Sequence, residues 1–233
     1  MKENVSAPLE IQTSETLKIG ILLALSGGLM DAYSYICRGG VFANAQTGNM
    51  LLLGVNLSSG KWMEAGRYAL PVFAFAMGIA IAEFIRFRMR DKNLLHWRQV
   101  TVFLEAVILL FVAFIPLTHN FLANSLTSFA CGMQVESFRK IHGNGIATTM
   151  CIGNLRTGTQ NFCEFVERRE WKHLKKSLLY YGIILFFVIG AIIGNQVIRW
   201  QGIRAIMVSS ALLAAAFLLM FTEGKRTQMQ RSK

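Results

Sequence analysis

Long stretches without charge are the feature that most limits how this chain can fold. Asp31 is the only charged residue between Lys18 and Arg38, and residues 177–198 carry no charge at all. A helix that spans a membrane needs about 20 mostly apolar residues. In the whole chain 16% of the residues are charged, whereas a soluble globular chain has about 25%. The pattern predicts an all-α integral membrane protein. Six spanning helices are expected, at 19–38, 66–87, 99–117, 121–138, 177–198 and 203–222.

The basic residues predict the orientation of these helices. If the N-terminus is cytoplasmic, the inner segments carry 19 of the 24 Lys and Arg residues, which gives the excess of positive charge typical of cytoplasmic loops. The other five, Arg38 among them, then lie in outer loops, and both termini are cytoplasmic. Topology therefore explains the net charge of +11, and we expect no binding to nucleic acid.

Two segments, 39–60 and 141–155, fit neither a spanning helix nor an ordinary loop. Their central parts are uncharged, yet rich in Gly, Asn, Gln and Thr. If both crossed the membrane, the cluster of basic residues in 86–98 would lie outside, against the usual charge distribution. We therefore expect re-entrant or broken helices, each entering and leaving on one side. Such backbone is tolerated at membrane depth only where protein or a watery cavity surrounds it.

The two halves of the chain repeat the same order of features. The segments that align are Leu25–Met30 with Phe129–Gln134, Gly48-Asn49 with Gly153-Asn154, and Met77–Ala82 with Ile189–Gly194. Three spans per half is an odd number, so the second half enters the membrane from the opposite side. This predicts an inverted repeat with a pseudo-twofold axis in the membrane plane. The expected regions are a cytoplasmic tail (1–18), a first membrane repeat (19–117), a second membrane repeat (118–222) and a basic cytoplasmic tail (223–233).

Small residues spaced four apart allow close contact between helices. Such pairs are Gly78 with Ala82 and Gly190 with Gly194. We expect them to pack the second span of each half against another helix. A homodimer formed through one of these faces is the alternative.

Three stretches resemble a known family. Gly27–Ala32, Val41–Asn49 and Gly143–Asn154 resemble the YoaK-like bacterial transmembrane proteins, also called domain of unknown function DUF1275. The resemblance covers about 19–222. It implies a multi-pass protein of the bacterial inner (plasma) membrane, and it implies no activity. Two positions of the second half depart from the pattern: Val135 follows Gln134 where Asn is expected, and Ile152 replaces the Thr of a Thr-Gly pair.

Polar residues inside the predicted membrane region are the candidates for a binding site. Two Gly-interrupted segments at matching positions of two halves are the best sequence indication of a solute site, although their Asn and Thr residues could instead cap half-helices. An ionisable residue at the depth of Asp31 normally faces the bundle interior, and capping a helix end is again the alternative. The predicted substrate-binding residues are Asp31, Asn44, Gln46, Thr47, Gly48, Asn49, Gln134, Thr149, Gly153 and Asn154.

Three further carboxylates lie within or at the ends of spans. Glu105 is expected either to pair with Arg98 near the inner surface or to be functional. Glu83 and Glu136 are each expected to form an ion pair with the arginine three residues further on.

No pattern in the sequence predicts an enzyme. The four cysteines form no C-x-x-C pair, the histidines lack ligand spacing, and no nucleophile or phosphate-binding motif occurs. We therefore expect no catalytic residues, no metal and no cofactor. The predicted function is that of a small-solute transporter or permease with a site near the membrane midplane. A channel and a non-catalytic membrane assembly or stress protein are the alternatives. The expected partners are the lipid bilayer and a small solute or ion whose identity the sequence does not give.

Overall fold

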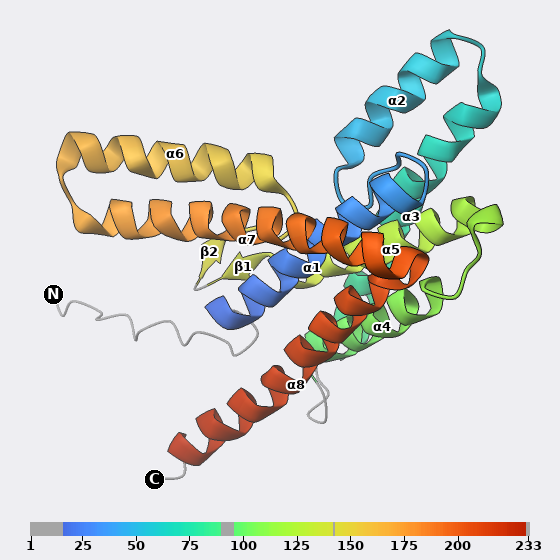
Figure 1. Ribbon diagram of the computed structural model, residues 1–233. Coiled ribbons are helices and arrows are strands. Elements are labelled where there is room, and N and C mark those ends of the chain that lie inside the picture. The colour runs from blue at the N-terminus through green and yellow to red at the C-terminus, as the bar shows by residue number, and fades with distance from the viewer. Residues whose placement is uncertain (1–15, 90–95, 142, 232–233) are drawn as a thin grey trace, which may run out of the picture.

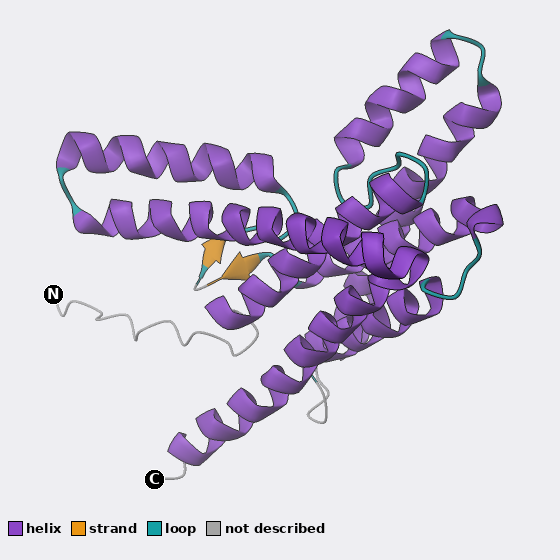
Figure 2. Ribbon diagram, in the orientation of Figure 1, coloured by secondary structure: helices purple, strands orange, loops and turns teal. Residues whose placement is uncertain are grey.

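The computed structural model describes residues 16–89, 96–141 and 143–231, with side chains up to residue 221. This part of the chain is almost entirely helical, as predicted (Figure 2). The exception within it is a pair of antiparallel two-residue strands, β1 (Lys140–Ile141) and β2 (Asn144–Gly145). The predicted tail 1–18 lies mostly outside the described residues. The helices are α1 (Leu17–Cys37), α2 (Gln46–Ser58), α3 (Trp62–Met89), α4 (Trp97–Val112), α5 (Asn120–Ser137), α6 (Cys151–Arg168), α7 (Trp171–Gln201) and α8 (Ile206–Arg231).

Three helical stretches in the described chain are long and apolar enough to cross a membrane. They are Leu17–Cys37, Trp62–Met89 and Trp171–Phe221, and the last, 51 residues long, covers α7 and most of α8. α4 has only 16 residues, or about 24 Å at 1.5 Å per residue, and it ends at Val112 rather than at the predicted 117. The predicted turn between the third and fourth spans is present as a short 3-10 helix, Leu117–His119.

The helices of the two halves pack in matching pairs. α1 packs along α7, and α3 packs along α5. α1 also contacts α8, α4 also contacts α5, and α4 and α8 contact each other. If α1 is exchanged with α5, α3 with α7 and α4 with α8, this set of contacts is unchanged. The crossing helices lie at the centre of the molecule (Figure 1).

Glycines allow the helices of the α1–α7 and α3–α5 pairs to approach each other closely. A Cβ added to Gly78 of α3 would overlap the carbonyl oxygen of Phe129 in α5, and one added to Gly190 of α7 would overlap that of Leu25 in α1. Phe129 and Leu25 are aligned positions of the two halves, so the two contacts are equivalent. The predicted packing role of these glycines is confirmed within one chain. Pairing with a second copy stays a prediction.

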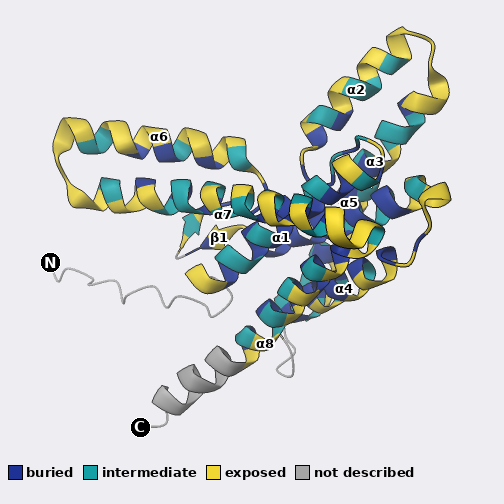
Figure 3. Cartoon of the chain, in the orientation of Figure 1, coloured by how far each residue is buried: buried dark blue, intermediate teal, exposed yellow. Residues whose placement is uncertain are grey.

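Two helical arms extend from this bundle (Figure 1). One arm is α2 with the first part of α3, and the other is α6 with the first part of α7. The arms are mostly exposed, whereas the buried residues gather where the helices cross at the base of the arms (Figure 3). α2 and α6 both begin at the bundle and run outward (Figure 1). α2 begins at Gln46, within the first of the two segments that were expected to be re-entrant or broken.

Candidate functional site

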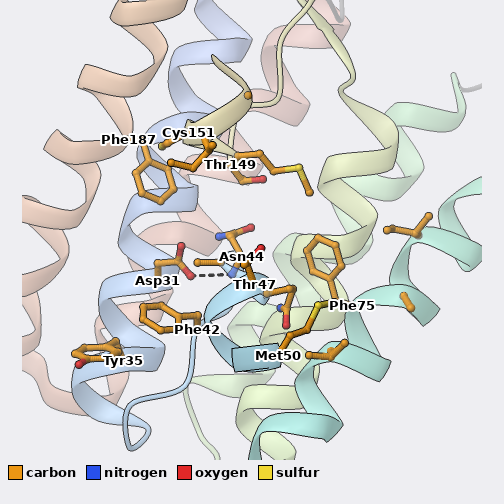
Figure 4. Close-up of a pocket in the computed structure, with 18 of the residues that line it drawn as sticks. Asp31, Tyr35, Phe42, Asn44, Thr47, Met50, Phe75, Thr149, Cys151 and Phe187 are labelled. Carbon is orange, nitrogen blue, oxygen red and sulfur yellow. Dashed lines mark hydrogen bonds between the residues drawn. The ribbon is translucent and has the colours of Figure 1, made fainter. Parts of the chain in front are cut away.

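A cavity of about 910 Å³ lies where the first residues of the two arms meet. Its walls come from α1, from the loop and first turn of α2, from α3, from the start of α6 and from Phe187 of α7. Figure 4 shows Thr149 and Cys151 on one side of it and Asp31 and Thr47 on the other. Segments more than 100 residues apart in the sequence therefore form one site.

The loop before α2 is held in place by polar side chains. The Asp31 carboxylate accepts the N–H of Asn44 at 2.7 Å, and the Asn44 amide donates to the carbonyl of Gly27 at 3.2 Å. Asn49 accepts the N–H of Phe42 at 3.0 Å and donates to the carbonyl of the same residue at 2.7 Å. These bonds satisfy loop backbone that has no partner in a helix, which is what irregular backbone requires at membrane depth.

The loop before α6 is anchored in a related way. Asn154 donates to the carbonyl of Ala147 at 2.6 Å, seven residues back, as Asn49 does to Phe42. Gln134 of α5 donates to the hydroxyl of Thr148 at 3.1 Å and to the carbonyl of Leu23 at 3.2 Å. The two broken elements thus share one anchor at equivalent asparagines.

The ten predicted site residues divide into two groups. Four of them hold the loops or pack beneath them and do not line the cavity. These are Asn49, Asn154 and Gln134, with the bonds given above, and Gly48, where a Cβ would lie 2.8 Å from the ring of Phe42. The six that line the cavity are Asp31, Asn44, Gln46, Thr47, Thr149 and Gly153.

Two polar atoms at the cavity wall have no hydrogen-bond partner in the described chain. They are Oδ1 of Asn44, a residue that is 3% exposed, and Oγ1 of Thr149, which is 4% exposed. Asn44 and Thr149 stand at aligned positions, each five residues before the Asn that anchors its loop. A buried polar atom without a partner is costly, so these two atoms are candidates for contact with a bound molecule.

Aromatic side chains that the sequence analysis did not select form much of the wall. Tyr35 and Phe42 stack with ring centroids 5.1 Å apart, and Phe75 and Phe187 also line the cavity. No sequence signal separates them from the aromatic residues that face lipid. The Asp31 carboxylate accepts its hydrogen bond from the loop backbone at Asn44 and not from Tyr33, two residues further along α1.

Tyr33 instead binds Arg38, which is fully buried and not exposed in an outer loop as expected. The guanidinium donates to the Tyr33 hydroxyl at 2.8 Å and to the carbonyls of Val112 and Ile115 at 3.2 and 2.8 Å. Bonds to the carbonyl of Pro116 and to the side chain of Asn120 use its remaining donors. The negative end of the α4 dipole faces this charge, so Arg38 ties α1 to the end of α4.

The expected ion pair of Glu105 with Arg98 is wrong. Glu105 is fully buried in α4, and neither carboxyl oxygen has a hydrogen-bond partner in the described chain. The two residues are two helical turns apart, about 10 Å along the axis, and the guanidinium of Arg98 lies over the ring of Trp97. The pairs of Glu83 and Glu136 with the arginines three residues further on are confirmed.

These features define a helical membrane protein with a part-polar cavity between two similarly packed halves. The family described as "Protein of unknown function (DUF1275)" matches residues 19–219, and the chain belongs to that family. It is 27% identical over 183 residues to the UPF0700 transmembrane protein YoaK of Bacillus subtilis (strain 168), which covers 74% of this chain and 79% of that protein. No solved structure matches the chain. The predicted family membership is confirmed.

Proposed function

We propose that the protein is a small-solute transporter whose solute binds in the cavity between the first residues of α2 and α6. The observation that carries the proposal is that both halves of the chain build this one cavity. Binding at the junction of two repeats, beside the starts of discontinuous helices, is the common plan of secondary transporters. The cavity volume of about 910 Å³ lies within the usual range for small-molecule sites.

The proposed topology has six spans, formed by α1, α3, α4, α5, α7 and α8, with α2 and α6 re-entrant. Both termini are cytoplasmic, in a bacterial inner membrane, and the halves are inverted repeats. The matching contacts of the two halves and the basic segments support this arrangement. Cysteines introduced at Lys61 and Arg169 should react with an impermeant maleimide from the outer and the cytoplasmic side, respectively. Reaction of both from the same side would contradict the topology.

Alternating access follows from this arrangement. In an inverted-repeat carrier, one half rocks against the other around a fixed site. The α1–α7 and α3–α5 contacts join the halves through glycines with no side chain between the backbones. Such smooth contacts can serve as pivots, because there are no interlocked side chains to separate.

Uptake into liposomes tests the function. Purified protein is reconstituted, offered a pool of metabolites and assayed for solutes that accumulate above empty vesicles. Ala76 lines the cavity, whereas Ala80, one turn further along α3, does not. Ala76→Trp should reduce uptake at least tenfold, and Ala80→Trp should leave it near the wild-type rate. Saturation of the rate with solute concentration separates a carrier from a channel. The absence of any flux, or full flux through Ala76→Trp, would refute the proposal.

A further inference from the structure

One end of the cavity is acidic. The Asp31 carboxylate lies at its wall and makes no ion pair in the described chain. The Oδ1 atom of Asn44 beside it is buried and accepts no hydrogen bond from the described residues, and it belongs to an amide whose nitrogen already donates to Gly27. A carboxylate and a free carbonyl oxygen together form a site for a donor with positive charge, such as an ammonium group.

The other end offers hydrogen-bond donors. α6 begins at Cys151 with no side-chain cap, and Cys151 to Gly153 lie on the cavity wall. The first N–H groups of a helix have no partner within it. Thr149, two residues before Cys151, packs its methyl group towards Gly27, and its buried hydroxyl has no partner among the described residues. An uncapped helix start with a free hydroxyl beside it suits a carboxylate.

The helix dipoles determine the net charge at each end of the cavity. A helix N-terminus carries about half a positive charge. At α2 the Asp31 carboxylate meets this charge, so roughly half a negative charge remains at that end. In the second half the position aligned with Asp31 is Val135 of α5, and the described cavity wall has no second acidic residue. The two ends are therefore opposite in sign, and a lone cation or a lone anion would be repelled by one of them.

The rest of the wall is apolar. Phe42, Phe75 and Phe187 line it, and none of the described residues that line it is basic. The volume of about 910 Å³ leaves room for a hydrophobic body beyond the charged groups. We infer that the cavity binds an amino-acid-type zwitterion with an apolar side chain, its ammonium group at Asp31 and Asn44 and its carboxylate at Thr149 and the start of α6. This inference rests on the proposed function, because it names the class of the solute.

Four ligands that share a phenyl body test the inference by direct binding. Phenylalanine carries both charges, phenethylamine only the positive one and 3-phenylpropanoate only the negative one. The fourth ligand, 2-phenylethanol, carries neither. Apparent dissociation constants are obtained from the rise in the unfolding temperature of the purified full-length protein with ligand concentration. Phenylalanine should bind at least tenfold more tightly than each of the other three.

Variants at the two ends should lose different parts of this preference. Asp31→Asn should bind phenylalanine no better than 3-phenylpropanoate. Thr149→Val, which replaces the hydroxyl with a methyl group, should reduce the preference for phenylalanine over phenethylamine about tenfold. Thr157→Val on the outer part of α6, away from the cavity, is the control and should bind like the wild type. Because Asp31 also holds the α2 loop, Thr149→Val keeps the inference testable if Asp31→Asn does not fold.

Several results would overturn the inference. Tightest binding by phenethylamine or 3-phenylpropanoate would show that only one end takes part, and equal binding of all four would show that neither does. Tighter binding of dihexanoyl-phosphatidylethanolamine than of phenylalanine would assign the cavity to a lipid head group. If phenylalanine binds more tightly than the other three ligands but no solute is transported, transport is refuted and the zwitterion site is not. Saturable flux of another solute, blocked in Ala76→Trp, without this selectivity would refute the zwitterion site alone.

Discussion

The two arms start at one cavity and end on very different surfaces. α2 has no charged residue and exposes apolar side chains such as Leu51 and Val55. α6 carries both acidic and basic residues and is tied to α7 by polar contacts, including Ser177 with the carbonyl of Gly158 at 2.9 Å and His173 with Glu164 at 2.7 Å. In the described chain no side-chain hydrogen bond joins α2 to α3. The α2 surface suits lipid, whereas the α6 surface suits water and anionic head groups.

What the arms share is confined to a few positions at their base. Each begins after a loop anchored by an asparagine to a carbonyl seven residues earlier, and each is carried on a helix that crosses its partner at a glycine. The contacts that determine the fold therefore lie at the base of the arms. The outer surfaces are free to differ, because they make few contacts with the bundle.

The glycine crossings should be the most sensitive test of this shared base. Gly78→Ala and Gly190→Ala should each destabilise the protein by about 3 kcal/mol, because a Cβ meets backbone that cannot turn aside. Gly54→Ala in α2 and Gly182→Ala in α7, where a Cβ would have open space, should be neutral or stabilise by up to about 1 kcal/mol. Thermal unfolding in detergent measures both pairs. A large loss in one half only would mean that the two crossings are not equivalent.

The loop anchors should differ in strength although they are equivalent in position. Asn49 makes three side-chain bonds, two to Phe42 and one to Gln46, whereas Asn154 donates one, to Ala147. At about 1 kcal/mol for each bond, Asn49→Ala should cost about 3 kcal/mol and Asn154→Ala about 1 kcal/mol. Unfolding midpoints of the two variants, compared with Asn56→Ala in the outer part of α2, measure this. Equal losses would show that the first loop is not the better anchored of the two.

The sequence allowed the elements and their order to be predicted, because both depend on local pattern. Uncharged runs marked the long helices, and the turn at Leu117–His119 followed from Pro116. Of the six predicted residues that line the cavity, Asp31 was found as the only charge in its span, and the others because Gly, Asn, Gln and Thr are unusual in an apolar stretch. Whether a polar residue faced the cavity or held its loop was not predictable, since Asn49 and Asn44 differ only in the partner that the fold brings to them.

The features that were missed depend on contacts between distant parts of the chain. Arg38 is buried because the end of α4, some 75 residues later, supplies carbonyls for its guanidinium. Glu105 is buried because its face of α4, which also carries Val102, Ala106 and Leu109, packs against α5 and α8. A prediction from the local charge pattern assigns charged residues to a surface, so the predictions for Arg38 and Glu105 were wrong.

Substitutions at the tips of the arms should change the stability least, and the changes at the two tips should have opposite signs. Both turns use a left-handed residue, which is Gly60 between α2 and α3 (φ 69°) and Arg169 between α6 and α7 (φ 56°). Glycine adopts this conformation freely, and other residues pay about 1 kcal/mol or more. Gly60→Ala should therefore destabilise the protein by about 1 kcal/mol. Arg169→Gly should stabilise it by about 0.5 kcal/mol, because the relief of strain is partly offset by the greater flexibility of the unfolded chain.

Arg169→Ala separates the effect of the backbone from that of the charge, because it removes the guanidinium and keeps the strain. Its unfolding midpoint should therefore stay at or below that of the wild type. If Ala stabilised as much as Gly, the cause would be repulsion among the basic residues at this tip, and the two turns would differ in charge rather than in backbone strain.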